Sequence, residues 1–175
     1  MKTLAFGPRK LSTLQVVTLG ILMAAQLILS RLTIGNQYLR FSFTFLVVAL
    51  MAEWFGPFWA AIAAGLVDII GTVMMGGQYF IGFTISAVVA ALIYGVAFYG
   101  RNHVGWSRII VAQLVIAVFV NAGLNTLWLY LMYQTPIWAI LPTRLLKEIL
   151  MTPIQIILIY LLLNNQIVQS LKNRL

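Results

Sequence analysis

Six stretches of the chain are almost free of charged residues, and each approaches the length of a membrane-crossing helix. They cover residues 13–31, 41–54, 56–75, 79–99, 106–132 and 143–164. A helix needs about 20 apolar residues to cross the hydrocarbon core of a bilayer, and shorter helices are tolerated inside a bundle. The pattern therefore predicts an all-α integral membrane protein with six transmembrane helices in a single membrane domain, residues 1–175.

The second and third stretches are separated only by a turn signal. In the segment "EWFGPFW", Gly56 and Pro57 stand side by side. Glycine breaks a helix, whereas proline suits the first turn of the next one. We expect the two stretches to form a tight helical hairpin, with Glu53 and Trp54 at its tip.

The composition indicates that lipid is the main solvent and limits the chemistry. Hydrophobic residues make up 62% of the chain and charged residues 8%, and the mean hydropathy is +1.00. A soluble domain of 175 residues exposes too much surface to hide this apolar fraction. With no cysteine, one histidine (His103) and three acidic residues far apart in the sequence, we expect neither a disulfide nor a metal site.

The positions of the basic residues predict the orientation. Six spans place both termini on one side, and if that side is the cytoplasm, seven of the 11 basic residues lie inside and four outside. The inner set is Lys2, Arg9, Lys10, Arg101, Arg108, Lys172 and Arg174, and the outer set is Arg31, Arg40, Arg144 and Lys147. This bias predicts cytoplasmic termini, and basic residues between apolar stretches indicate contact with membrane lipid rather than nucleic acid. No small-residue cleavage site follows the first stretch, so we expect no cleaved signal peptide.

Asp68 is the one charged residue inside the apolar segment "GLVDIIGTVMMGGQYFIGFT". A carboxylate at the centre of a membrane helix costs about 2.5–3.5 kcal/mol on insertion scales. Ala61, Gly65 and Thr72 follow the helical spacing that puts them on its face, and small residues let a second helix approach closely. We therefore expect Asp68 to face protein or a cavity rather than lipid.

Other polar residues are predicted to lie at the same, outer end of the bundle, whereas the inner halves of the spans are nearly free of them. The predicted binding residues are Asp68, Gln78, Tyr79, Asn121, Asn125, Trp128, Arg31, Arg40, Arg144 and Lys147. Amides and a carboxylate in an aromatic-lined hole suit a flat heterocycle with N–H donors. Cations at the mouth suit a ligand with an anionic tail.

Each of these groups also has a structural interpretation. Asp68 could pair with Arg31 or Arg144, because buried ionisable groups usually pair. Asn121 and Asn125 could join helices to one another. Arg144, Lys147 and Glu148 could form a hydrated cluster at the membrane interface. Gln78 and Tyr79 could belong to an ordinary loop.

The sequence contains no motif for ATP hydrolysis or for another hydrolytic reaction. It lacks the G-x-x-x-x-G-K-[ST] phosphate loop, the G-x-S-x-G elbow and the H-E-x-x-H zinc helix. We therefore expect no enzyme activity and no catalytic residue, and an ATP-driven partner must supply the energy. Gly20 and Ala24 form a small-xxx-small pair that could dock such a partner, whereas the stripe Ala87, Ala91 and Gly95 favours packing within the chain.

Several motifs together resemble a known family. They are Phe55-Gly56-Pro57, the G-x-x-D-x-x-G pattern of Gly65, Asp68 and Gly71, the segment Tyr79–Ala87, and Leu92–Gly95. With "ILSRL" and "LPTRLLKEILMTPIQ", they resemble the substrate-binding (S) components of energy-coupling factor (ECF) vitamin transporters, in particular the folate-specific branch. Ile81 departs from this branch, where proline is expected, and Glu148 stands where an amide is more usual.

The resemblance implies a six-helix S-component bundle in the bacterial cell membrane that binds folate from outside with high affinity and needs no cofactor. It further implies docking, through Gly20 and Ala24, on a transmembrane coupling subunit driven by two ATPase subunits. The pterin ring would face Asp68, Gln78 and Asn125. The glutamate tail would face one or more of the four outer cations, Arg31, Arg40, Arg144 and Lys147.

Two alternatives remain. The same fold could bind another flat vitamin, such as riboflavin, thiamine or a queuosine precursor, which lack the dicarboxylate tail. The chain could also be a membrane assembly protein whose polar cluster only joins helices.

Overall fold

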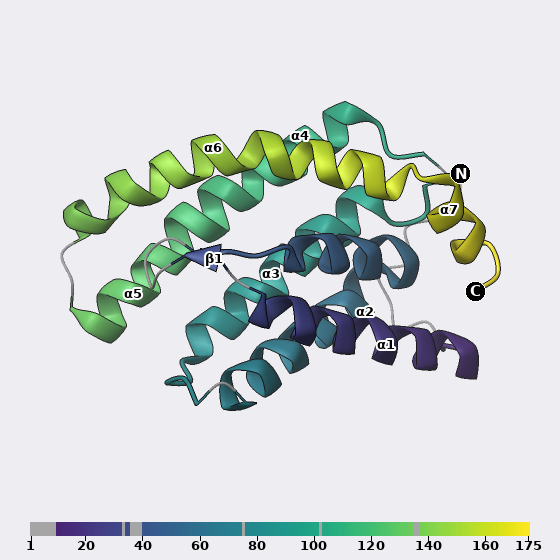
Figure 1. The fold of residues 1–175 in the computed structure, drawn as a ribbon, viewed down its shortest axis with the longest axis horizontal. Coiled ribbons are helices and arrows are strands. Elements are labelled where there is room, and N and C mark those ends of the chain that lie inside the picture. Colours follow the sequence, from purple (N-terminus) through teal and green to yellow (C-terminus); the bar gives the residue numbers. More distant parts are fainter. Residues whose placement is uncertain (1–9, 33, 36–39, 75, 102, 135–136) are drawn as a thin grey trace.

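The computed structural model describes residues 10–32, 34–35, 40–74, 76–101, 103–134 and 137–175, without the side chains of residues 34–35, 40–41 and 139–140. Almost all regular structure is helical (Figure 1). The helices are α1 (Thr13–Arg31), α2 (Thr44–Met74), α3 (Ile81–Phe98), α4 (Trp106–Val115), the π-helix η1 (Ile116–Leu124), α5 (Asn125–Tyr133), α6 (Ile137–Leu163) and α7 (Gln166–Lys172). Two short strands, β1 (Ile34–Gly35) and β2 (Arg40–Phe41), pair antiparallel.

In the described part of the chain, five helical segments are long and apolar enough to cross a membrane. They are α1, α2, α3, the continuous run Trp106–Tyr133, and Leu141–Leu163 within α6. The chain is therefore a multi-pass membrane protein, as predicted. The predicted span 41–54 corresponds to the part of α2 before Gly56, which is roughly 18 Å long at 1.5 Å per residue. A separate sixth crossing stays a prediction.

Gly56 divides α2 at the predicted turn. Its φ of 86° and ψ of 175° are not helical, and Pro57 starts the second part. A Cβ on Gly56 would lie 3.2 Å from the Tyr99 ring, and a Cβ on Gly95 would lie 2.3 Å from Pro57 Cα. The backbones of α2 and α3 thus approach closely at the turn. This contact confirms that Gly95, in the small-residue stripe of the fourth apolar stretch, packs within the chain.

The beginning of α1 and the end of the chain lie at the same end of the bundle, the right side of Figure 1. Ser12 and Gln15 form a capping box at the start of α1, and Gln15 Nε2 donates to the Leu175 carbonyl at 2.9 Å. An even number of membrane crossings would place both ends of the chain on the same side of the membrane. That this end faces the cytoplasm stays a prediction.

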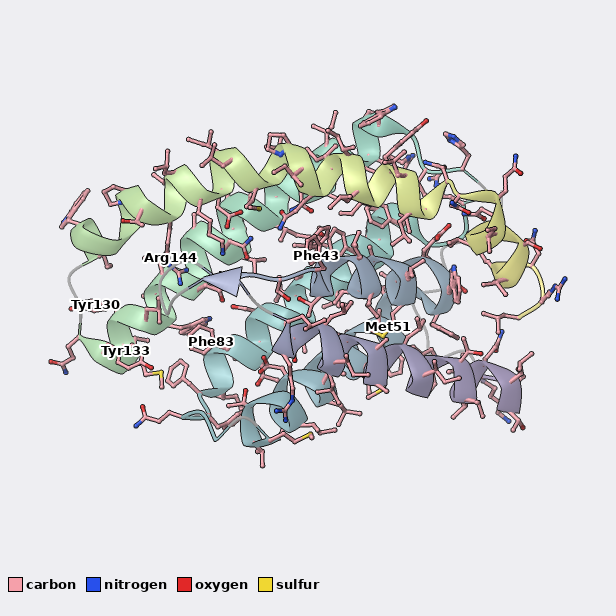
Figure 2. The ribbon with its side chains drawn as sticks, in the orientation of Figure 1. Phe43, Met51, Phe83, Tyr130, Tyr133 and Arg144 are labelled. Carbon is pink, nitrogen blue, oxygen red and sulfur yellow. The ribbon has the colours of Figure 1, made fainter. Side chains whose placement is uncertain are left out.

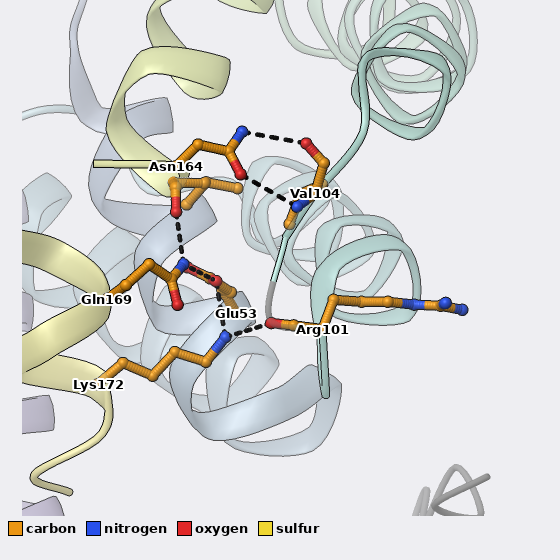
Figure 3. Close-up of polar contacts among 7 residues, drawn as sticks. Glu53, Arg101, Val104, Asn164, Gln169 and Lys172 are labelled. Atoms are coloured by element: carbon orange, nitrogen blue, oxygen red, sulfur yellow. Dashed lines mark hydrogen bonds and ion pairs between the residues drawn. The ribbon is translucent and has the colours of Figure 1, made fainter. Parts of the chain in front are cut away.

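A polar cluster holds α7 to the bundle (Figure 3). We call Glu53, Arg101, Gln169 and Lys172 the α7 cluster. Lys172 Nζ lies 2.7 Å from Glu53 Oε1 and donates to the Arg101 carbonyl at 2.6 Å, and Gln169 Nε2 donates to Glu53 Oε1 at 2.8 Å. Close by, Asn164 exchanges two hydrogen bonds with the Val104 backbone, at 3.1 and 3.2 Å. The predicted hairpin tip is thus buried beneath α7.

The interior of the bundle is apolar and so is much of its outside. Phe98, Met51, Ile109 and Ile159 are among the largest fully buried side chains. Many aliphatic residues face outward, such as Val73 at 68% exposure. In a membrane, lipid tails cover such a surface, so an apolar exterior is what a bundle of transmembrane helices requires.

Candidate functional site

A cavity of about 640 Å³ lies between α1, α2, α3, α6 and the run α4–η1. This volume falls within the range of roughly 300–1,000 Å³ that holds small organic ligands. Figure 2 shows Phe43, a lining residue just before α2, between the start of that helix and α6. Among the predicted site residues, the cavity is lined by Asp68, Asn121 and Lys147. Segments distant in the sequence therefore do converge on one hollow.

Asp68 reaches the cavity from α2 and is half-buried. Thr84 Oγ1, on α3, donates to Asp68 Oδ2 at 2.7 Å and lies 3.1 Å from the Tyr79 hydroxyl. Within the described residues, neither cation proposed as its structural partner pairs with Asp68. Arg31 Nη2 donates to the Met74 carbonyl at 3.5 Å, and Arg144 binds elsewhere. Among the described residues, a hydroxyl group rather than a cation therefore compensates the Asp68 carboxylate.

The opposite wall of the cavity carries Lys147 and Glu148 on α6. Asn121 Nδ2, on η1, donates to Glu148 Oε2 at 3.1 Å, and Arg144 Nη1 donates to the Asn121 carbonyl at 3.1 Å. Figure 2 shows Arg144 between α6 and the neighbouring α5–η1 run. Glu148 is only 9% exposed. Glu148 is therefore part of the interior, with Arg144 and Lys147 half-buried, and the three do not form a hydrated surface cluster.

The π-helix η1 interrupts the fifth apolar stretch and was not predicted. The Asn125 N–H donates to the Val120 carbonyl, five residues back, which is the wider π-type turn. Asn121 lines the cavity, whereas Asn125 is not among the lining residues and donates from its Nδ2 to Asn121 Oδ1 at 3.5 Å. Trp128 Nε1 donates a hydrogen bond to Ser86 Oγ on α3 at 3.0 Å. The wider turn makes the residues after it face a different direction from the one that an α-helical register would give.

The remaining predicted residues lie away from the cavity or outside the description. Gln78 and Arg31 are exposed, and Tyr79 is 44% exposed and reaches Asp68 only through Thr84. The side chain of Arg40 lies outside the described part of the chain. Binding roles for these residues stay predictions.

The cavity also has a polar region that was not predicted. The Tyr94 hydroxyl donates to Gln113 Oε1 at 2.6 Å, and Gln113 Nε2 donates to Gln155 Oε1. These three residues line the cavity together with Gln26 of α1. The expectation that the inner halves of the spans are nearly free of polar groups is therefore wrong. The available signal was a lone amide in an apolar stretch, because a buried amide costs free energy unless it is hydrogen-bonded.

The predicted docking pair lies on the outside of α1. Gly20 and Ala24 are exposed, and a Cβ on Gly20 would meet no described atom within 4 Å. Their neighbours Ile21 and Ile28 are more than 60% exposed. Unlike the stripe of α3, this one is open. Docking of a partner on it stays a prediction.

In the part of the chain that the structure describes, no group of three or more His, Cys, Asp or Glu residues could hold a metal ion.

A family model described as "ECF transporter, substrate-specific component" matches residues 14–163. The chain belongs to this family. Its members are transport proteins rather than enzymes and the family implies no cofactor, so the two corresponding predictions are confirmed.

Similar proteins carry a more specific name. The chain is 41% identical over 165 residues to the folate transporter FolT of Leuconostoc mesenteroides, covering 91% of this chain and 89% of that protein. It is 36% identical over 147 residues to the folate transporter FolT of Clostridium novyi, covering 83% and 85%. A crystal structure of FolT bound with folic acid matches with a TM-score of 0.83 and 36% identity, covering 87% of this chain and 94% of that one. The resemblance to the folate-specific branch is thus confirmed.

Proposed function

We propose that this chain is the folate-binding S component of an ECF-type ABC importer, and that it captures folate outside the cell. One observation carries the proposal: in a cavity of about 640 Å³, one wall has a carboxylate that pairs with no cation among the described residues, and the opposite wall has a lysine. Relatives at 41% and 36% identity that bear the name folate transporter support the choice of ligand.

The two walls suit the two ends of folate. The pterin ring is flat and carries N–H donors, and an ionised carboxylate has about four acceptor sites, of which Thr84 uses one at Asp68. The aromatic rings of Phe43 and Tyr94 line the space between the walls. The glutamate tail carries two carboxylates, which Lys147 and the neighbouring Arg144 attract by charge-assisted hydrogen bonds. The ring therefore binds near Asp68 and the tail near Lys147 on α6.

The loaded protein then docks on a transmembrane coupling subunit driven by two ATPase subunits. The chain has no phosphate-binding loop of its own, so the energy must come from this partner. Lipid provides no hydrophobic driving force for helix association, so small residues that allow close packing are favoured at such contacts. The open stripe of Gly20 and Ala24 on α1 would let a helix of the partner approach closely. The protein resides in the bacterial cell membrane, with both termini in the cytoplasm.

Thermal unfolding of the purified protein in detergent tests the ligand. A ligand that binds only the folded state raises the melting temperature as its concentration rises. We expect such a rise with folate and none with riboflavin, thiamine or a queuosine precursor. A rise with one of those compounds but not with folate would reassign the ligand. The absence of a rise with all four would favour a membrane assembly protein.

A further inference from the structure

Gln26 is a buried polar residue whose side-chain oxygen has no hydrogen-bond partner among the described residues. It lies on α1, is only 8% exposed and lines the cavity. Its Oε1 atom has no hydrogen-bond partner among the described residues. A buried carbonyl oxygen without a partner costs free energy of folding, so its presence calls for an explanation.

Gln15, on the same helix, shows how a glutamine of equal burial is normally used. It is 9% exposed. Its Oε1 accepts from the Ser12 N–H at 3.0 Å, and its Nε2 donates to the Leu175 carbonyl at 2.9 Å. Both ends of the Gln15 amide therefore serve the fold, whereas the Gln26 oxygen serves no described contact.

The position of Gln26 relates it to Asp68. A Cβ on Gly71 would lie 3.4 Å from Leu27 Cδ2, so α1 contacts α2 at the residue directly after Gln26. Gly71 follows Asp68 by three residues and shares its helical face. Gln26 and Asp68 thus line the cavity from two adjacent helices, and both offer acceptor oxygens.

We propose that Gln26 Oε1 accepts a hydrogen bond from an N–H group on the flat ring of the ligand, and that Gln26 is a specificity-determining residue of the cavity. This inference rests on the proposed folate-binding function. Acceptor oxygens from Gln26 and Asp68 repel the carboxylates of the glutamate tail and match ring N–H donors. The contact therefore selects the ring end of the ligand.

The test compares Gln26→Met with the matched control Gln15→Met. Folate and pteroate, which lacks the glutamate tail, are titrated calorimetrically into each purified protein, and the melting temperature is measured without ligand. We expect Gln26→Met to weaken the binding of both ligands about tenfold, the size of one lost hydrogen bond. Its melting temperature without ligand should stay equal or rise, because an apolar group replaces the unpartnered carbonyl. Gln15→Met should lower the melting temperature and leave affinity unchanged.

The outcomes separate this inference from the proposed function. A wild-type protein that binds no folate overturns both. Wild-type binding with unchanged affinity in Gln26→Met overturns the role of Gln26 alone. A Gln26→Met variant that weakens folate but not pteroate contradicts the assignment to the ring. A lower melting temperature without any change in affinity shows that Gln26 serves the fold.

Discussion

The two carboxylates Glu53 and Asp68 lie on α2, on either side of the break at Gly56, and have different partners. Glu53 is 1% exposed, and its Oε1 accepts from Lys172 at 2.7 Å and from Gln169 at 2.8 Å. Asp68 is half-buried, accepts from the Thr84 hydroxyl at 2.7 Å and faces a cavity. The charge of Glu53 is compensated within the protein, whereas part of the capacity of Asp68 is left for a ligand.

The partners of an acidic residue distinguish a structural role from a binding role better than its polarity does. Both residues are acids next to apolar stretches of the sequence. What distinguishes them is the partner. A cation and an amide of the chain both bind Glu53 Oε1, whereas Asp68 accepts from a neutral hydroxyl and lines the cavity. Variants at the two places should therefore affect different measured quantities.

The largest expected effect is on stability, at the α7 cluster. Lys172→Met leaves the fully buried Glu53 side chain without its cation, which typically costs about 3–5 kcal/mol. We expect the free energy of unfolding, measured by denaturant in detergent, to fall by about this amount, with unchanged folate affinity. The double variant Glu53→Gln, Lys172→Met should recover most of the loss, since removing both charges is often neutral. A single variant as stable as the wild type would contradict a structural role for the pair.

The next effect is on affinity, at the cavity. Asp68→Asn removes the charge that we propose binds ring N–H groups, so we expect folate binding to weaken by about 1.5–3 kcal/mol. Stability without ligand should stay equal or rise, because the variant removes a charge from the membrane interior. Calorimetric titration and thermal unfolding measure the two quantities. Unchanged affinity would exclude Asp68 from the site.

A smaller effect should distinguish the two ends of the ligand. The double variant Arg144→Gln, Lys147→Met removes the cations nearest to the predicted position of the tail. We expect folate to bind about 1–1.5 kcal/mol more weakly, and pteroate to bind as well as before. Titration of both ligands into one preparation provides the internal control. An equal loss for both would place these cations at the ring instead.

The smallest effect concerns the hydroxyl that holds Asp68. Thr84→Val keeps the side-chain shape and removes the donor to Asp68 Oδ2. We expect folate affinity to fall by about 0.5–1 kcal/mol, because Asp68 loses orientation but keeps its charge. A competition assay against wild-type protein resolves so small a difference. A loss as large as that of Asp68→Asn would mean that Thr84 contacts the ligand itself.

Local signals predicted much of the fold. The predicted span 13–31 coincides with α1, and Gly56 breaks α2 where the Gly-Pro pair stands. The predicted sixth span starts at residue 143, just after Pro142. The helix begins at Ile137 and continues through this proline, which membrane helices tolerate. The π-turn of η1 has no comparable local signature.

The candidate site was predictable only where a residue was unusual by itself. Asp68, Asn121 and Lys147 are polar at a common depth, and all three line the cavity. Gln113 and Gln155 are 42 residues apart and meet only because α4 and α6 pack together. Their contact depends on helix packing across the bundle, which no spacing within one stretch encodes.

Mass spectrometry of small molecules released from freshly purified, denatured protein tests the central claim most directly. Wild-type protein and Asp68→Asn are prepared side by side, with Lys172→Met as a control for loss of stability. The account predicts that the wild-type protein and the folded fraction of Lys172→Met both release folate. The Asp68→Asn protein should release little or none. Equal folate from wild type and Asp68→Asn, or a different flat vitamin in its place, would contradict it.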